Sequence, residues 1–317
     1  MGEIQMNRDR ETIYSEYPPV PNNMIMELTN ACNHKCVFCG NHNQNRRVSV
    51  MDSQLAFSLI DQAYDLGVRE IGFYLGGEPF LSPILRDCIW HSYRKTDGEK
   101  KMDYIYITTN GALATPERVK ELVEAGLSSI KFSVNGATRE SYRSVHGRDD
   151  FEKVYNNIRD INKAITDGEY ELGRYISFIK CKQNALDVDL MHQLFDKLVD
   201  HVYIWDVEPK NGGYNYDSSS FALPGQTNKG NMTWPCEMIF NRLHVTSQGY
   251  LDACCIDYDN TLVVTDLRKM SLKDAWTCDV MRGLRRRHLN KERCSDRCWS
   301  CISGTDYENI RPINSQL

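Results

Sequence analysis

Short apolar runs alternate with segments of helical periodicity along the first two thirds of the chain. An apolar run bounded by turn residues is typical of a buried strand, and apolar residues spaced three and four apart are typical of a helix. The predicted strands are residues 24–28, 70–75, 104–108, 129–134, 175–179 and 202–205. The predicted helices between them are residues 53–66, 85–93, 116–125, 151–165 and 186–198. Ser53 is the expected N-cap of the first helix.

This order of elements predicts a parallel sheet with helices outside it, although periodicity does not decide whether the sheet closes. The regular pattern stops at residue 210. We therefore divide the chain into a lead-in at 1–22, an α/β unit at 23–210, a segment rich in Gly, Ser and Asn at 211–233, and a C-terminal unit at 234–317. Residues 211–233 are either a plain linker or a loop that closes over a substrate. The C-terminal unit is expected to be a small metal-bound appendage.

Charge and hydropathy argue against two classes of partner. The 317 residues carry a formal net charge of −5, which provides no broad basic surface for nucleic acid. No apolar run reaches the length of a membrane span, and the first residues lack the apolar core of a signal peptide. We therefore expect a cytoplasmic protein that binds neither nucleic acid nor a membrane.

Twelve cysteines occur mostly in tight clusters, which in a chain of this size favours metal ligation over disulfides. Cys32, Cys36 and Cys39 directly follow the first predicted strand. Loops at this end of parallel strands are where sites are built. Three thiolates on one loop can hold one face of a [4Fe-4S] cluster and leave one iron open, whereas a closed cluster takes four cysteines. A zinc site that adds His34 or His42 fits the spacing as well.

Two motifs resemble the signatures of the radical S-adenosylmethionine (SAM) superfamily. One is the C-x3-C-x-aromatic-C run with Phe38 at the aromatic position, and the other is Gly76-Gly77-Glu78-Pro79 after the second predicted strand. The resemblance implies a partial (β/α)6 barrel in which the open iron binds the amino and carboxylate groups of SAM. It also implies that an electron from the [4Fe-4S] cluster cleaves SAM to methionine and a 5'-deoxyadenosyl radical.

The same resemblance implies further contacts to SAM. Asn110 ends the third predicted strand and Ser133 the fourth, where the superfamily places polar groups near the ribose and carboxylate. Arg143 lies where many members have an arginine that pairs with the carboxylate. A plain turn at Asn110 and a solvated helix face at Arg143 are the alternatives. The implied SAM-binding residues are Phe38, Gly76, Gly77, Glu78, Pro79, Asn110, Ser133 and Arg143.

The second group of cysteines lies in the C-terminal unit. Cys236 is followed by twelve residues, Gly249, four residues and Cys254, and the glycine permits a tight hairpin that returns the second thiolate beside the first. Together with the later pair Cys298 and Cys301, this spacing resembles the shortened SPASM domain called twitch. The resemblance implies one auxiliary [4Fe-4S] cluster with these four ligands, and a structural zinc site is the alternative.

The remaining cysteines have weaker assignments. Three roles are open for Cys255 and Cys294. Each is a ligand of the auxiliary cluster in place of one named above, a donor of a hydrogen atom to a radical, or a thiol packed in the interior. Cys278 is predicted to lie in the middle of a helix at 272–288. Cys88 and Cys181 are expected to be packed in the interior.

The similarity to twitch-bearing dehydrogenases of aminocyclitols implies that the radical takes a hydrogen atom from a small polar substrate such as a sugar or an aminocyclitol. Oxidation follows if the auxiliary cluster accepts an electron, and epimerisation follows if Cys255 or Cys294 returns a hydrogen atom. A peptide-modifying enzyme and a zinc-binding interaction protein are the rival hypotheses. The expected partner is a flavodoxin- or ferredoxin-type electron donor, for which Arg282 and residues 285–287 offer either a docking surface or a plain solvated face.

Overall fold

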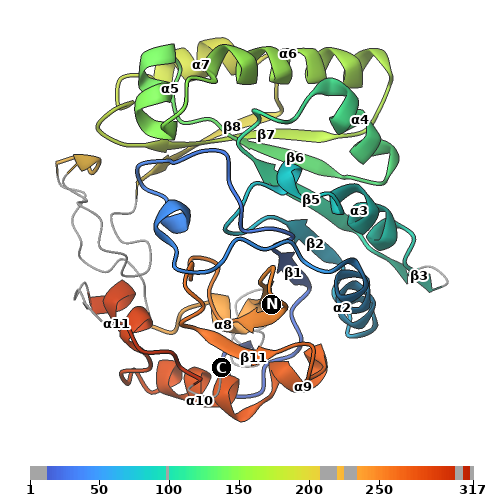
Figure 1. The fold of residues 1–317 in the computed structure, drawn as a ribbon, viewed down its shortest axis with the longest axis vertical. Helices are drawn as coiled ribbons and strands as arrows, with labels where there is room; N and C mark the ends of the chain where they lie inside the picture. The colour runs from blue at the N-terminus through green and yellow to red at the C-terminus, as the bar shows by residue number, and fades with distance from the viewer. Residues whose placement is uncertain (1–12, 98–99, 208–219, 225–233, 304–309, 315–317) are drawn as a thin grey trace, which may run out of the picture.

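The computed structural model describes residues 13–97, 100–207, 220–224, 234–303 and 310–314. Its centre is one nine-stranded sheet (Figure 1). The six predicted strands are present as β1 (Asn23–Met26), β2 (Glu70–Phe73), β5 (Tyr104–Thr109), β6 (Ser129–Ser133), β7 (Gly173–Lys180) and β8 (His201–Asp206). They lie side by side in this order and pair in parallel throughout. The predicted parallel sheet is therefore confirmed.

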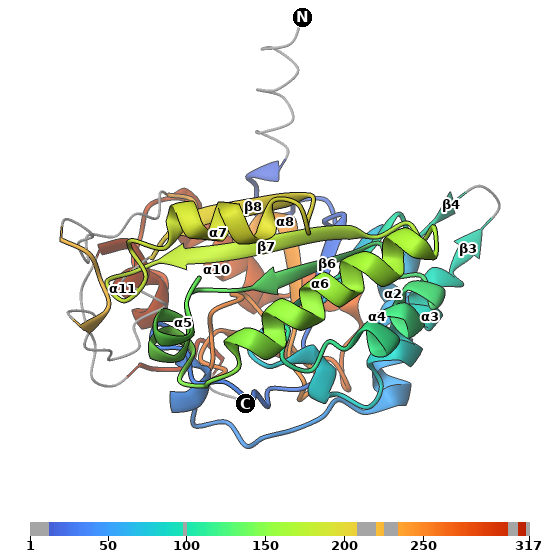
Figure 2. The same ribbon diagram turned by 90° about the horizontal axis from the view of Figure 1, so that it is seen from above.

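Helices cover the outer face of this sheet, and Figure 2 shows α6 running along it beside β6. The five predicted helices are α2 (Ser53–Asp65), α3 (Leu85–Tyr93), α4 (Pro116–Glu124), α6 (Phe151–Asp167) and α7 (Val188–Phe195). The sequence pattern missed α5 (Arg139–His146) and a small hairpin of β3 (Thr96–Asp97) and β4 (Lys100–Lys101). No helix in the described ranges is long and apolar enough to span a bilayer.

The expected cap of α2 was wrong by one residue. Asp52 is the N-cap, and its side chain accepts the N–H of Leu55 at 2.9 Å. Ser53 is the first residue inside the helix. An aspartate cap also adds a negative charge at the positive end of the helix dipole.

The two faces of the sheet differ in chemistry, because successive side chains of a strand point to opposite sides. Ile71, Phe73, Ile105 and Ile107 face outward and are buried in one core with the helices. We call the opposite side the inner face. Polar and aromatic residues of this face, on the strands or directly after β2, include Asn23, Glu70, Tyr74, Tyr104, Tyr106, Lys131, Tyr175, Tyr203, Arg242, His244 and Asp252. This face is therefore suited to polar ligands.

The C-terminal segment is part of the same sheet. β9 (Arg242–Val245) pairs in parallel with β1, and β10 (Tyr250–Asp252) and β11 (Val263–Asp266) continue the sheet in antiparallel fashion. The predicted turn before β10 is present, with Gly249 at a φ of +81°. β11 and β8 form the two edges, so the barrel is partial and does not close. The cysteine-rich segment is thus an extension of the sheet and not an appendage, a relation that local periodicity does not encode.

The C-terminal helices also differ from expectation. They are α8 (Met238–Asn241), α9 (Leu272–Trp276), α10 (Asp279–Leu289) and α11 (Asp296–Ser303). The single helix predicted at 272–288 is broken, and Cys278 is the N-cap of α10. The mid-helix position expected for Cys278 was therefore wrong. Of the predicted loop at 211–233, only residues 220–224 lie within the described part of the chain.

Arg285 of α10 does not belong to a solvated basic face. It is 0 % exposed, and it donates to the carbonyl oxygens of Ile239 at 2.9 Å and Trp276 at 2.7 Å. Its guanidinium also lies 3.9 Å from the centre of the Trp276 ring. Arg286 and Arg287 remain exposed. Helical periodicity explains the difference, because consecutive residues of a helix point in directions about 100° apart.

A buried ion pair joins three distant segments at the end of β1. Glu27 is 0 % exposed, and its two carboxylate oxygens accept from Arg46 at 2.9 and 3.0 Å. The same carboxylate accepts the N–H of Gly76 at 3.1 Å and both the N–H and the hydroxyl of Ser247 at 2.9 and 2.8 Å. Glu27 therefore fixes the first cysteine loop, the end of β2 and the C-terminal turn relative to one another.

Candidate functional site

The first three cysteines lie together on the loop that follows β1. Burial, and then the neighbouring Cys39 and Cys32 thiols, raise the pKa of Cys36 well above its ordinary value. Burial likewise raises the pKa of Cys39. Thiols with raised pKa values keep their protons until a metal binds and displaces them. The loop is therefore suited to binding a metal and not to presenting a free thiolate as a nucleophile.

Cys36 and Cys39 each contact a residue that is far away in the sequence. The Sγ of Cys36 lies 3.5 Å from Nδ1 of His146, and the Sγ of Cys39 lies 3.7 Å from the hydroxyl of Tyr258. His146 comes from α5, and Tyr258 comes from the C-terminal segment. Sequence reasoning missed both, because neither is close in the chain and neither forms a motif with the cysteines.

His146 is held in one orientation. Its Nε2 accepts the backbone N–H of Asn135 at 3.0 Å, so the proton of the neutral ring is on Nδ1, which faces Cys36. Burial lowers the pKa of His146 well below its ordinary value, so the ring is neutral. Nδ1 of His34 lies 3.2 Å from Nδ1 of His146, and Nε2 of His34 lies 3.1 Å from Asp150. Both rings are thus occupied by hydrogen bonds.

The arrangement fits a cluster better than a zinc ion. Thiolates around tetrahedral zinc lie about 2.3 Å from the metal and so about 3.8 Å from one another. Within the described residues, two separate groups each contain three possible ligand atoms that lie within 4.8 Å of one another. One group is His34, Cys36 and His146, and the other is His288, Cys294 and Cys298. Cys32, Cys36 and Cys39 do not form such a group, as expected for thiols that hold separate corners of a cubane. His42 is exposed.

The Gly76-Gly77-Glu78-Pro79 motif packs against the cysteine loop. A Cβ on Gly77 would lie 2.1 Å from the carbonyl oxygen of Thr29, so that position requires glycine. Pro79 begins the short 3-10 helix η2 (Pro79–Leu81). Here the second glycine allows close contact between β2 and the cysteine loop.

Glu78 connects the ends of neighbouring strands. Its buried carboxylate accepts the hydroxyl of Thr109 at 2.7 Å, the N–H of Asn110 at 2.8 Å and the N–H of Phe80 at 3.1 Å. Asn110 in turn donates to the side-chain oxygen of Asn33, inside the cysteine loop, at 2.8 Å. These bonds fix the loop over the carboxyl ends of β2 and β5.

The other predicted SAM-binding residues differ in where they lie relative to the cysteine loop. Phe38 is 7 % exposed and packs with Val145 and Cys181 behind the loop, and Ser133 ends β6. Arg143 is not with them, because it lies on the exposed side of α5. That helix buries Tyr142 and turns His146, not Arg143, toward the cysteines. The pairing of Arg143 with the SAM carboxylate stays a prediction, with the solvated helix face as its alternative.

The four predicted auxiliary ligands surround one cavity of about 250 Å³. Cys236, Cys254, Cys298 and Cys301 come from three segments and line it together with Cys255 and His288. Burial raises the pKa of Cys236 to about 11. The set fits a closed four-cysteine cluster, with Cys255 left over.

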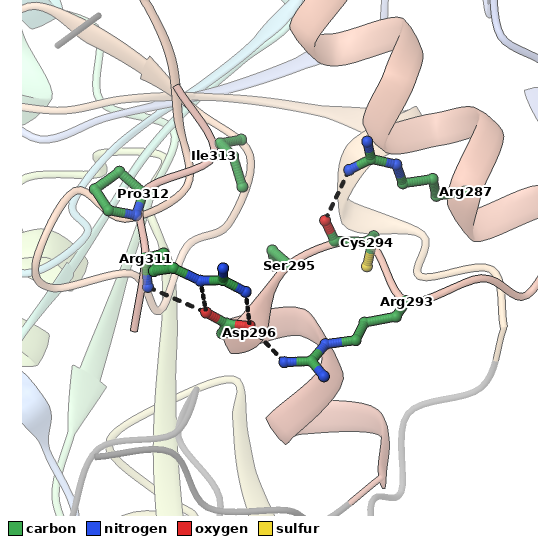
Figure 3. Close-up of a pocket in the computed structure, with 8 residues that line it drawn as sticks. All are labelled: Arg287, Arg293, Cys294, Ser295, Asp296, Arg311, Pro312 and Ile313. Atoms are coloured by element: carbon green, nitrogen blue, oxygen red, sulfur yellow. Dashed lines mark hydrogen bonds and ion pairs between the residues drawn. The ribbon is translucent and has the colours of Figure 1, made fainter. Parts of the chain in front are cut away.

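Cys294 lies behind this cavity. Its Sγ is 3.2 Å from Nε2 of His288, and it also lines a separate hollow of about 530 Å³, shown in Figure 3. There Asp296 pairs with Arg293 at 2.7 Å and with Arg311 at 3.0 Å, and Arg287 donates to the Cys294 carbonyl oxygen at 3.1 Å. Cys294 thus lies next to the auxiliary site but lines the outer hollow, and not the cavity that the four predicted ligands surround.

Cys255 reaches the inner face of the sheet. Its thiol is close to the Cys254 thiol, His244 and Arg242, all of which lower its pKa. Cys255 also raises the pKa of Tyr74, after the larger effects of burial and of Tyr106. Of the two spare cysteines, Cys255 is therefore the one beside the polar side chains of the sheet.

Residues 26–173 match the radical SAM superfamily, and residues 236–302 match the iron-sulfur cluster-binding domain SPASM. The chain carries a radical SAM domain followed by a SPASM domain. It therefore binds SAM and a [4Fe-4S] cluster in the first domain and auxiliary iron-sulfur in the second. The predicted family and cofactors are thus confirmed.

Solved structures share this fold. BtrN in complex with AdoMet and 2-DOIA has a TM-score of 0.58 at 20% identity, covering 92% of this chain and 98% of BtrN. Streptococcus suis SuiB bound to its precursor peptide SuiA has a TM-score of 0.66 at 14% identity, covering 88% of this chain and 68% of SuiB. The partial radical SAM barrel predicted from the sequence agrees with both.

Curated relatives catalyse different reactions. GTP 3',8-cyclase of Chlorobaculum tepidum is 34% identical over 127 residues, or 40% of this chain and 37% of the relative. PqqA peptide cyclase of Streptomyces rochei is 29% identical over 128 residues, or 40% of this chain and 33% of the relative. The chain thus spans less than half the length of these relatives, and the shared part does not fix a substrate.

Proposed function

We propose that this protein is a radical SAM oxidoreductase that removes a hydrogen atom from an unactivated carbon of a small polar substrate and oxidises that carbon. The observation that carries the proposal is that the segment carrying the auxiliary cysteines contacts the first cysteine loop and borders one polar sheet face. Tyr258, four residues after Cys254, reaches Cys39, and Cys255 lies beside Tyr74 of the inner face.

Different side chains hold the clusters, position the cysteine loop and bind the substrate. Cys32, Cys36 and Cys39 hold the first cluster, and Cys236, Cys254, Cys298 and Cys301 hold a single auxiliary cluster. When bound, the first cluster supplies the electron that cleaves SAM to methionine and a 5'-deoxyadenosyl radical, and the auxiliary cluster supplies an acceptor for an electron from the substrate. The bonds of Glu78 and Asn110 hold the cysteine loop in place for SAM. The inner face binds and orients the substrate.

Epimerisation is the second candidate, and the position of Cys255 favours it. A thiol on the inner face can return a hydrogen atom to the opposite side of a carbon radical, and the resulting thiyl radical then needs one electron and one proton to become a thiol again. For this role Cys255 is preferred over Cys294, which faces His288 and the outer hollow. Replacing Cys255 by Ala distinguishes the two outcomes, because an oxidised product would still form whereas an inverted product would not.

Peptide modification is the third candidate. The likeness to SuiB, solved with its precursor peptide, and to PqqA peptide cyclase supports it. A flavodoxin- or ferredoxin-type protein is the proposed electron donor for all three reactions, and the exposed Arg286 and Arg287 of α10 are the cations available for its docking.

One experiment separates these candidates. Anaerobically reconstituted protein is incubated with SAM, a reductant and deuterated sugars, cyclitols or peptides, and the 5'-deoxyadenosine is analysed by mass spectrometry. Transfer of deuterium from a sugar or cyclitol supports the proposal, and transfer from a peptide alone replaces it with the third candidate. Stoichiometric zinc without absorbance near 400 nm would refute all radical chemistry.

A further inference from the structure

Two cations of the inner face lack an acidic partner. Lys131 lies on β6 and Arg242 on β9, and no ion pair joins either of them to a carboxylate within the described ranges. Burial lowers the pKa of Lys131, and the charge of Arg242 lowers it further. β1, β2 and β5 separate the two strands in the sheet, and the alternation of side chains along the paired strands places both cations on the inner face.

Several buried donors and acceptors around these cations are unused. Nε of Arg242, both ring nitrogens of His244, Oδ2 of Asp252 and the hydroxyl of Thr108 are buried and have no hydrogen-bond partner of good geometry among the described residues, although the Cys255 thiol lies near His244. His244 is 0 % exposed and follows two residues after Arg242 on the same face of β9. Most buried polar groups in proteins are hydrogen-bonded, so a group of unused ones indicates a ligand that the chain alone does not supply.

Three carboxylates lie on or beside this face, and no ion pair joins any of them to Lys131 or Arg242 within the described residues. Asp252 lies opposite His244 in the pairing of β9 and β10; its Oδ1 accepts the N–H of Cys254 at 2.9 Å, and its buried Oδ2 has no hydrogen-bond partner among the described residues. Glu70 accepts from the side-chain amides of Asn22 at 3.2 Å and Asn23 at 3.0 Å. Glu27 is bound by Arg46 in the ion pair described above. Two positive charges without an ion-pair partner are costly in a partly buried space unless an anion joins them.

We propose that Lys131 and Arg242, with His244, form a binding site for an anionic group of the substrate, either a carboxylate or a phosphate. This inference rests on the proposed function, in which the inner face holds the substrate. The guanidinium of Arg242 binds an anion through two N–H groups, and Lys131 adds a point charge. The ammonium of an aminocyclitol would meet two like charges here, so among small polar substrates the proposed site favours a sugar acid, a sugar phosphate or another small anion.

The test uses calorimetry with the reconstituted, SAM-bound protein and two probes, inorganic phosphate and acetate. The wild type is expected to bind one equivalent of at least one probe, and the preferred probe tells a phosphate site from a carboxylate site. Lys131→Met and Arg242→Gln should each weaken that binding by about tenfold or more, because each removes a charged hydrogen-bonding partner. Lys131→Arg should retain most of it.

Matched controls are exposed cations on outer helices, Lys120→Met on α4 and Arg159→Gln on α6, which should bind the probe like the wild type. Far-UV circular dichroism and iron content verify the fold of every variant. Equal affinity in Lys131→Met and Lys120→Met, or no binding of either probe by the wild type, would overturn the inference. SAM cleavage by the wild type is measured separately, so that its absence beside intact anion binding would refute the proposed function and leave the anion site standing.

Discussion

The two cysteine groups differ in how the chain builds them. Cys32, Cys36 and Cys39 occupy one loop of eight residues, and local spacing alone brings them together. The auxiliary group is collected from the start of α8, the end of β10 and α11, and it contains more thiols than one cluster needs. Three ligands leave one metal position open, whereas four ligands close a site, and when they come from distant segments the metal also holds those segments together.

The largest expected effect concerns the local site. Cys36→Ala should lower reductive formation of 5'-deoxyadenosine by about 100-fold or more, because two thiolates on one loop do not retain a cubane. Chromatography of anaerobic reactions measures this, with Cys88→Ala of α3 as the control. Retained SAM cleavage would contradict the assignment of the loop.

Loss of a ligand from the auxiliary cysteine group should change the iron content but not the first cluster. Cys301→Ala is expected to reduce the iron content from about eight to about four atoms per chain, since one closed cluster is lost. The paramagnetic resonance signal of the reduced first cluster, and its change on adding SAM, should persist. Loss of both clusters together would show that the two sites are not independent.

Glu27 tests how strongly the two regions are coupled. Glu27→Gln leaves Arg46 buried without its carboxylate, and such a loss typically costs about 3–5 kcal/mol. Chemical denaturation of the metal-free protein measures the change, with the exposed Asp149→Asn, which breaks the surface pair with Arg139, as the comparison. A cost below about 1 kcal/mol, the value usual for a surface pair, would mean that the regions are held mainly by strand pairing.

The smallest effect is expected at the first cluster itself. The Nδ1–H of His146 lies 3.2 Å from Nδ1 of His34 and 3.5 Å from the Sγ of Cys36, so the two atoms share it. Its interaction with the sulfur favours the more negative, reduced cluster. His146→Phe should therefore lower the reduction potential by on the order of 40 mV, if the bond is worth about 1 kcal/mol for one electron. Redox titration followed by paramagnetic resonance measures the shift, and an unchanged or raised potential would contradict this role.

The sequence predicted the elements with strong local signals. The parallel strands, the outer helices and the cysteine spacings depend on side-chain periodicity or on neighbours within a few residues. The errors occurred where a local pattern had more than one solution. The pattern of 272–288 suits one helix or two, and α5, which turns His146 to the cysteines, was not among the predicted helices.

By itself, the sequence determined the three-cysteine loop, the motif after β2 and the alternation of strands and helices, because each is a relation between residues close along the chain. The tertiary structure alone decided that β9 pairs with β1, that Tyr258 reaches Cys39, and that Lys131 and Arg242 lie on the same face of one sheet. These contacts join residues more than a hundred positions apart, and what fixes them is the packing of the whole sheet and not a preference of any segment.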